Sequence, residues 1–235
     1  MSEHTQIAMV WWAIVFMLIF GTACAALMGV FPPIPASLDP DAVAAFYAEN
    51  SLPIRIGAAV AVGTGGFMLP MAAVISLQMV RIDERLTIWA VLQGMGGAMM
   101  SLWLVFPAIY WGVAAFDPER APPITALMNQ TAFLTLVTTI PHYIFQVLAI
   151  AWVCLSRQDE PYTPFPRWLG YFSLWTFLIT EVGAMGFLFR SGPFAWHGLF
   201  VFWFPILAFT AWMAALTCTL IRALKHQISL SPVAS

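Results

Sequence analysis

Hydrophobic residues occur along the chain in long runs that short polar stretches separate. A helix needs about twenty consecutive apolar residues to cross the hydrocarbon core of a bilayer, at a rise of about 1.5 Å per residue. Six runs reach that length, at residues 8–30, 54–80, 86–115, 125–155, 168–189 and 198–221. The pattern therefore predicts an all-α fold: a polytopic membrane helix bundle with six transmembrane helices, in which residues 1–235 form a single transmembrane domain.

The polar stretch between the first two runs reads FPPIPASLDPDAVAAFYAEN and contains signals for a helix start. Asp39 is a favourable N-cap, Pro40 suits the first helical position, and Asp41 is favourable at the positive end of a helix dipole. Apolar residues follow at helical spacing as far as Glu49. We therefore expect a short amphipathic helix over residues 40–49, lying either on the outer membrane surface or over the mouth of the bundle.

The composition agrees with a membrane location. Hydrophobic residues make up 61% of the chain and charged residues only 9%, against a charged share of about a quarter in soluble domains. The partner that this composition predicts is the lipid bilayer. The net charge is −2 and no basic cluster is present, so the sequence gives no indication of nucleic-acid binding.

The first apolar run is predicted to be a membrane span and not a cleaved signal peptide. The residues before it, SEHTQ, include no lysine or arginine, which a signal peptide carries in that position. The run is also longer than the roughly 7–15 apolar residues of a signal peptide.

Basic residues predict how the six runs are oriented. Both termini and the loops after the second and fourth runs carry six of them, and the opposite loops carry three. The first group is Arg81, Arg85, Arg157, Arg167, Arg222 and Lys225, and the second is Arg55, Arg120 and Arg190. Because lysine and arginine accumulate on the cytoplasmic side of a membrane, we expect both termini to be cytoplasmic.

Polar residues within the fourth run recur at helical spacing. They are Thr131, Thr135, Thr138, His142 and Gln146, at intervals of four, three, four and four. Such spacing places them on one helix face, which is expected to point to the bundle interior and away from lipid. Pro141 interrupts the run and predicts a kink beside His142.

Glu181 lies in the fifth run, within FLITEVGAMGF, and is expected at nearly the same depth as His142. An unpaired carboxylate at that depth costs at least a few kcal/mol, so Glu181 is predicted to face inward and to pair or be protonated. The third run adds Gln93 to the inward polar residues. The candidate ligand-binding or proton site is therefore Glu181, His142, Gln146, Thr138 and Gln93, although the same residues could serve only as polar contacts between helices.

Two further groups of residues carry predictions about packing and the outer face. Small residues such as Gly21 and Ala25 in the first run are predicted to let helices approach closely. Arg55, Arg190 and His197 form a second candidate polar group at the outer face. The simpler interpretation is that these three side chains lie at the membrane interface and extend their polar ends toward water, as long polar side chains ordinarily do.

Catalytic chemistry and bound cofactors find no support in the sequence. The chain has four histidines, too few for a membrane di-iron site, and His142 and His197 are expected at different depths, which argues against a bis-histidine haem. The three cysteines have no metal-binding or disulfide spacing. We therefore expect no metal, no cofactor and no catalytic residues, and an enzyme is less favoured than a non-enzyme.

Two segments resemble a group of uncharacterised bacterial integral membrane proteins with six spans. They are FPPIPASLDPDAVAAFYAEN with the following IRIG, and RSGPFAWHGLFVFW before the last run. The resemblance extends from the first loop to the last run. It implies a location in the bacterial inner membrane and assigns no activity and no site.

The sequence supports two hypotheses of function. In the first, the protein binds or transports a small or lipophilic ligand in a polar-lined cavity between spans three, four and five. In the second, it is a non-catalytic scaffold or accessory subunit of a larger membrane complex, or forms a homo-oligomer.

Overall fold

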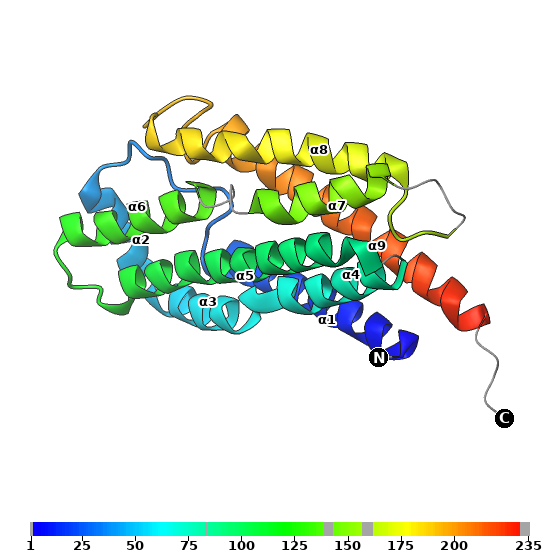
Figure 1. The fold of residues 1–235 in the computed structure, drawn as a ribbon. Coiled ribbons are helices and arrows are strands. Elements are labelled where there is room, and N and C mark those ends of the chain that lie inside the picture. The colour runs from blue at the N-terminus through cyan, green and yellow to red at the C-terminus, as the bar shows by residue number, and fades with distance from the viewer. Residues whose placement is uncertain (1, 83, 139–142, 157–161, 231–235) are drawn as a thin grey trace.

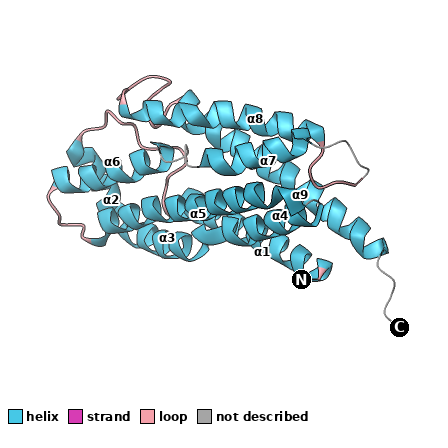
Figure 2. Cartoon of the chain, viewed as in Figure 1, coloured by secondary structure: helices cyan, strands magenta, loops and turns pink. Residues whose placement is uncertain are grey.

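The computed structural model describes residues 2–82, 84–138, 143–156 and 162–230. These residues form helices joined by loops, with no strand among them (Figures 1 and 2). The predicted all-α class is therefore confirmed.

Four helical stretches in this part of the chain are long and apolar enough to cross a membrane. The first joins α1 (Glu3–Thr22) to a π-helical turn (Ala23–Leu27), and the second joins α3 (Ser51–Thr64) through a 3₁₀ turn (Gly65–Phe67) to α4 (Met68–Ile82). The third is α5 (Thr87–Phe116), which follows a 3₁₀ turn (Glu84–Leu86), and the fourth joins a π-helical turn (Leu199–Trp203) to α9 (Phe204–Leu230). They coincide with the runs predicted at residues 8–30, 54–80, 86–115 and 198–221.

The other two predicted runs correspond to shorter helices. The run at 125–155 contains α6 (Pro122–Thr138) and α7 (Ile144–Ser156), and residues 139–142 between them lie outside the described part. The run at 168–189 contains α8 (Arg167–Glu181) and a 3₁₀ turn (Val182–Phe187). In Figure 1, α6 and α7 follow one another along α5, and both pack against it.

The helix predicted in the first loop is α2, and its bounds, Pro40–Glu49, agree with the prediction. An Asp39 carboxylate oxygen accepts a hydrogen bond from the Asp41 amide at 2.9 Å, as expected of an N-cap. Val43 and Tyr47 are buried. The Tyr47 hydroxyl donates to Asn129 Oδ1 of α6 at 2.8 Å, so α2 is attached to α6.

The helices are arranged in a closed ring that follows chain order. The first stretch packs against α3 and α4, these pack against α5, α5 packs against both α6 and α7, α7 packs against α8, and α8 packs against α9. The ring closes because α9 packs against α1. Both termini lie at the same end of the bundle, and α2 lies toward the opposite end (Figure 1).

Buried side chains form two clusters, one toward each end of the helix bundle. The cluster at the end with the termini includes Met71, Tyr143 and Trp212, and the cluster beside α2 includes Trp111 and Phe133. Large apolar side chains are also exposed on the outside of the bundle, as at Ile88 (67%) and Leu207 (62%). An apolar outer surface of this kind suits contact with lipid chains and not with water.

Candidate functional site

Gln93 and Gln146 meet in the interior, at the contact between α5 and α7. Both side chains are fully buried, and Gln146 Nε2 donates to Gln93 Oε1 at 3.4 Å. Gly96 permits the approach, because a Cβ at this position would lie 2.6 Å from the backbone nitrogen of Gln146. The structure thus brings together two of the predicted site residues.

The same contact extends to α4. Gln93 Nε2 donates to the Ala72 carbonyl oxygen at 2.8 Å and also to Ser76 Oγ. Ser76 Oγ in turn donates to the Ala90 carbonyl oxygen at 2.7 Å. Gln146 Oε1 is buried and has no hydrogen-bond partner among the described residues. Three helices are therefore joined by a polar contact, and one of its acceptors, Gln146 Oε1, has no partner in the part of the chain that the structure describes.

Two threonines of the predicted stripe direct their hydroxyl groups to their own helix. Thr138 Oγ1 donates to the Leu134 carbonyl oxygen at 2.6 Å, and Thr131 Oγ1 donates to the Leu127 carbonyl oxygen at 2.8 Å. Both threonines are only partly buried. The fully buried face of α6 instead carries Asn129 and other residues, because α2 and α5 cover that side.

Glu181 is the last residue of α8 and is half-buried. Its Oε1 atom is buried, and no hydrogen-bond partner for it exists among the described residues. The predicted partner, His142, lies outside the described residues. The predicted pairing of Glu181 with His142 therefore stays a prediction.

The candidate group at the outer face is not joined into one site. The Arg55 guanidinium lies 5.1 Å from the centroid of the Phe116 ring, Arg190 is exposed in the loop before the last span, and His197 Nδ1 accepts a hydrogen bond from the Ala36 amide at 3.1 Å. No hydrogen bond or ion pair joins the three side chains within the described part of the chain.

His197 instead attaches one loop to another. Trp196, its neighbour, donates from Nε1 to the Ile34 carbonyl oxygen at 2.8 Å. These bonds hold residues 34–36 of the first loop against the loop before the last span. Burial lowers the pKa of His197 from its ordinary value, which keeps the imidazole neutral and Nδ1 able to accept.

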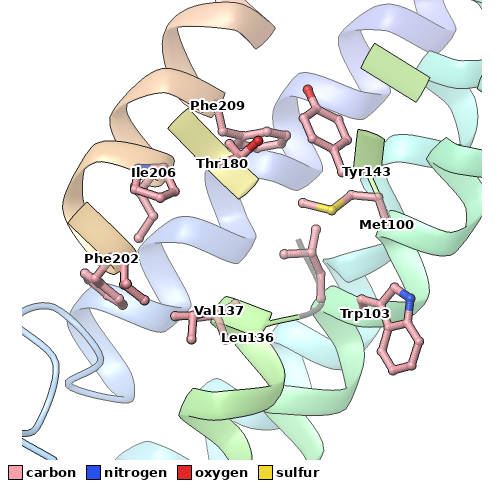
Figure 3. A pocket seen from close by; sticks show the side chains of 12 residues that line it. Met100, Trp103, Leu136, Val137, Tyr143, Thr180, Phe202, Ile206 and Phe209 are labelled. Atoms are coloured by element: carbon pink, nitrogen blue, oxygen red, sulfur yellow. The ribbon is translucent and has the colours of Figure 1, made fainter. Parts of the chain in front are cut away.

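A cavity of about 80 Å³, which we call the core cavity, lies between the two clusters of buried side chains. Side chains from four of the predicted spans surround it, as Figure 3 shows. They are Met100, Trp103, Leu104, Leu136, Val137, Tyr143, Thr180, Val201, Phe202, Pro205, Ile206 and Phe209. The lining is therefore almost wholly apolar.

The core cavity differs from the predicted site in its lining. The spans that were expected to form it, three, four and five, contribute, but the last span contributes as well. Gln93, Gln146, Thr138 and Glu181 are not among its lining residues. The one residue of the fifth span that faces it is Thr180, whose hydroxyl already donates to the carbonyl oxygens of Thr176 and Phe177.

A larger hollow of about 460 Å³, which we call the outer hollow, adjoins the core cavity beside the first span. The two spaces share the lining residues Leu104, Leu136, Ile206 and Phe209. Gly21 and Ala25 also line the outer hollow, and a Cβ at Gly21 would meet no atom within 4 Å. The prediction that Gly21 permits close helix packing is therefore wrong: its small size leaves open space.

Both spaces lie beside helical segments with π-helical hydrogen bonding. Cys24 of the turn Ala23–Leu27 lines the outer hollow, and Val201 and Phe202 of the turn Leu199–Trp203 line the core cavity. A π-helical turn inserts a residue into an α-helix and is frequent at functional sites. No pattern in the sequence predicted either π-helical turn.

A second buried polar cluster, not predicted from the sequence, joins the ends of α1, α4 and α9. Gln78 Nε2 donates to Gln6 Oε1 at 2.7 Å, and Gln227 Nε2 donates to Gln78 Oε1 at 2.9 Å. At the exposed edge of this cluster, Arg81 Nη1 forms an ion pair with Glu3 Oε1 at 2.7 Å. Gln78 interrupts an apolar run, which was a signal for an inward polar residue, but its partners lie far away in the sequence.

The described residues offer no chemistry of metal binding. No group of three or more histidine, cysteine or acidic side chains that could hold a metal ion occurs among them. Cys24, Cys154 and Cys218 are free thiols. The arrangement is suited to holding an apolar molecule by contact and exclusion of water.

No protein-family model, no curated protein and no solved structure matches the chain.

Proposed function

We propose that this chain is a multi-pass protein of the bacterial inner membrane that binds a small lipophilic molecule in the core cavity. The molecule reaches the cavity from the bilayer through the outer hollow. The observation that carries the proposal is the set of four lining residues that the two spaces share. A chain-like molecule could lie across both spaces and contact this set along its length.

Six crossings of the membrane are part of the proposal. The ring of helices closes only if α6 with α7, and α8 with its 3₁₀ turn, each fill a place beside the four longer stretches. Six crossings also agree with both termini lying at one end. Together with the distribution of basic residues, this supports cytoplasmic termini.

Volume supports a ligand that occupies both spaces. The core cavity, at about 80 Å³, is smaller than the roughly 150 Å³ cavity that admits benzene in other proteins. The outer hollow, at about 460 Å³, falls in the range of about 300–1,000 Å³ that is typical of ligand sites. The core cavity therefore suits the end of a molecule whose remainder lies in the outer hollow.

Access from lipid follows from the position of the outer hollow. Leu18 lines it and is 60% exposed on the outside of α1. Because the outside of the bundle faces lipid chains in this proposal, the hollow opens toward the bilayer and not toward water. An apolar molecule dissolved in the membrane would then reach the site without crossing an aqueous phase.

The experiment uses a fatty acid with a photoreactive diazirine in its chain, bound to the purified protein in lipid nanodiscs. We expect crosslinks at Met100 and Leu104, which face the core cavity, and competition by excess unlabelled oleic acid. Ile206→Trp, which fills the space shared by cavity and hollow, should abolish these crosslinks. Leu207→Trp is the matched control, since Leu207 points outward and is 62% exposed.

Two results would count against the proposal. Crosslinks confined to outward residues in the wild-type protein would mean that the chain only contacts lipid, as an accessory subunit of a membrane complex would. Equal loss of crosslinks in Ile206→Trp and Leu207→Trp would mean that the extra indole acts on the fold and not on the cavity.

A further inference from the structure

A third hollow lies at the end of the bundle that carries the termini, between the start of α8 and the last turns of α9. Its volume is about 130 Å³, and we call it the rim pocket. It is lined by Tyr162, Thr163, Pro166, Trp168, Thr219 and Arg222. It shares no lining residue with the core cavity or the outer hollow.

Arg222 supplies positive charge to the rim pocket. Its guanidinium carbon lies 5.1 Å from the centroid of the Tyr162 ring. The His226 ring, one turn further along α9, stacks on Tyr162 with centroids 3.9 Å apart and planes 18° apart. The guanidinium of this exposed side chain therefore lies over the Tyr162 ring, and no carboxylate among the described residues forms an ion pair with it.

Other groups around the rim pocket favour an anion. The pocket adjoins the first residues of α8, the end at which a helix dipole is positive. Thr163 Oγ1 accepts from the Phe165 amide at 3.2 Å, which leaves its hydroxyl proton to donate. Asp159 and Glu160 precede Tyr162 in the sequence and lie outside the described residues.

The surroundings of the rim pocket place it at a membrane surface. Trp168 lines it and is 53% exposed, and tryptophan is enriched at the level of lipid headgroups. The pocket also lies where the apolar outside of α9 gives way to Arg222 and Lys225. Basic pockets between transmembrane helices on the cytoplasmic side bind anionic lipid headgroups.

We infer that the rim pocket binds the phosphodiester headgroup of an anionic phospholipid. Arg222 contacts the phosphate through two guanidinium nitrogens, as arginine does with phosphate oxygens. The Thr163 hydroxyl donates to the phosphate or to the headgroup alcohol. The acyl chains extend along the outside of α8 and α9, past the exposed indole of Trp168.

The test compares phosphatidylglycerol with phosphatidylcholine by native mass spectrometry of the purified full chain after exchange into mixed micelles. Both lipids carry a phosphodiester, but only phosphatidylglycerol has a net negative charge. We expect the wild-type protein to retain phosphatidylglycerol in preference, and Arg222→Gln to weaken that preference about fivefold, the value of one basic residue at a membrane surface. Lys225→Gln, which removes the same charge from an exposed position outside the pocket, should change it less than twofold.

A second variant and a competitor separate the alternatives. Arg222→Lys keeps the charge without the paired nitrogens, and should lie between wild type and Arg222→Gln. Equal retention of the two lipids by the wild-type protein overturns the inference and needs no variant. Equal loss in Lys225→Gln and Arg222→Gln also overturns it, since the effect would then be one of overall charge. Displacement of phosphatidylglycerol by millimolar inorganic phosphate would identify a site for free phosphate and overturn the lipid assignment.

Discussion

Buried amide side chains in this bundle differ in how many of their hydrogen bonds are made. Gln93 donates to two acceptors on α4 and accepts from Gln146. Gln146 Oε1 has no such partner among the described residues. In the hydrocarbon region a polar atom without a partner is unfavourable. Gln93 should therefore contribute more to the stability of the fold than Gln146 does.

Replacing each of these glutamines by leucine tests that difference. Gln93→Leu removes bonds to Ala72 and Ser76, and we expect it to lower the free energy of unfolding by about 0.6–1.7 kcal/mol, from the average to the maximum found for a polar contact between transmembrane helices. Gln146→Leu removes one long bond, which leaves Gln93 Oε1 without its donor, and an acceptor that has no partner among the described residues, so it should be less destabilising than Gln93→Leu. The measurement is thermal unfolding in detergent, with each variant compared with wild type.

The reverse order would contradict this account. If Gln146→Leu were the more destabilising variant, Gln146 would have a partner, such as a bound ligand or water, that matters more than its contact with Gln93. Asn129→Leu provides a reference, because it removes the acceptor of the Tyr47 hydroxyl at a site outside the Gln93 contact.

Inward polar residues could be predicted singly from the sequence, but their partners could not. Gln93 and Gln146 were identified because each interrupts an apolar run. The contact of Gln78 with Gln6 and Gln227 joins helices that are 72 and 149 residues apart, and no local pattern encodes that distance. The core cavity could not be predicted from the sequence for a related reason. Its lining residues are ordinary apolar side chains, and only their packing in the folded chain distinguishes them from other apolar residues.

Among the elements, those with local signals were predicted best. The bounds of α2 follow from Asp39 and Pro40, which act within one turn of the helix start. The π-helical turns Ala23–Leu27 and Leu199–Trp203 were not predicted, because they depend on what the helix packs against. The junction of residues 34–36 with Trp196 and His197 likewise forms only in the folded chain.

Acidification should loosen this junction. His197 accepts a hydrogen bond through Nδ1, which requires the neutral ring, and burial lowers its pKa in the folded state below the unfolded value of about 6.5. As the pH falls through the unfolded value, the unfolded state takes up a proton first. The stability contributed by the neutral ring is therefore present above about pH 6.5 and is lost as the pH falls toward the folded pKa.

Hydrogen exchange of the peptide containing Ala36 measures the effect. After correction for the intrinsic rate, its protection should be lower at pH 5.5 than at pH 7.5. His197→Gln, which cannot titrate in this range, should lose the pH-dependent part. If the protection of this peptide still depends on pH in His197→Gln, another group causes the dependence, and the role given to His197 is contradicted.

On the scale of the whole molecule, the ring of helices explains why both termini lie together. An even number of crossings returns the chain to the side on which it starts, and both four and six crossings satisfy that condition. The two numbers differ in where they place the ends of α7 and α8. Six crossings put the end of α7 on the side of the termini and the loop after α8 on the opposite side.

Three serine-to-cysteine substitutions distinguish these topologies with little change in size. In a background without native cysteines, Ser156→Cys marks the end of α7, Ser191→Cys the loop after α8, and Ser229→Cys the end of α9, all at exposed positions. With a membrane-impermeant maleimide, we expect Ser156→Cys and Ser229→Cys to react only in inverted vesicles, and Ser191→Cys only in intact spheroplasts. Reaction of Ser156→Cys and Ser191→Cys from the same side would show that α8 does not cross, because its two ends could then not be separated by a bilayer. The ring of helices would then include a helix that rests on the membrane surface, and the core cavity, which Thr180 of α8 lines, would lie open to water and not be sealed by lipid.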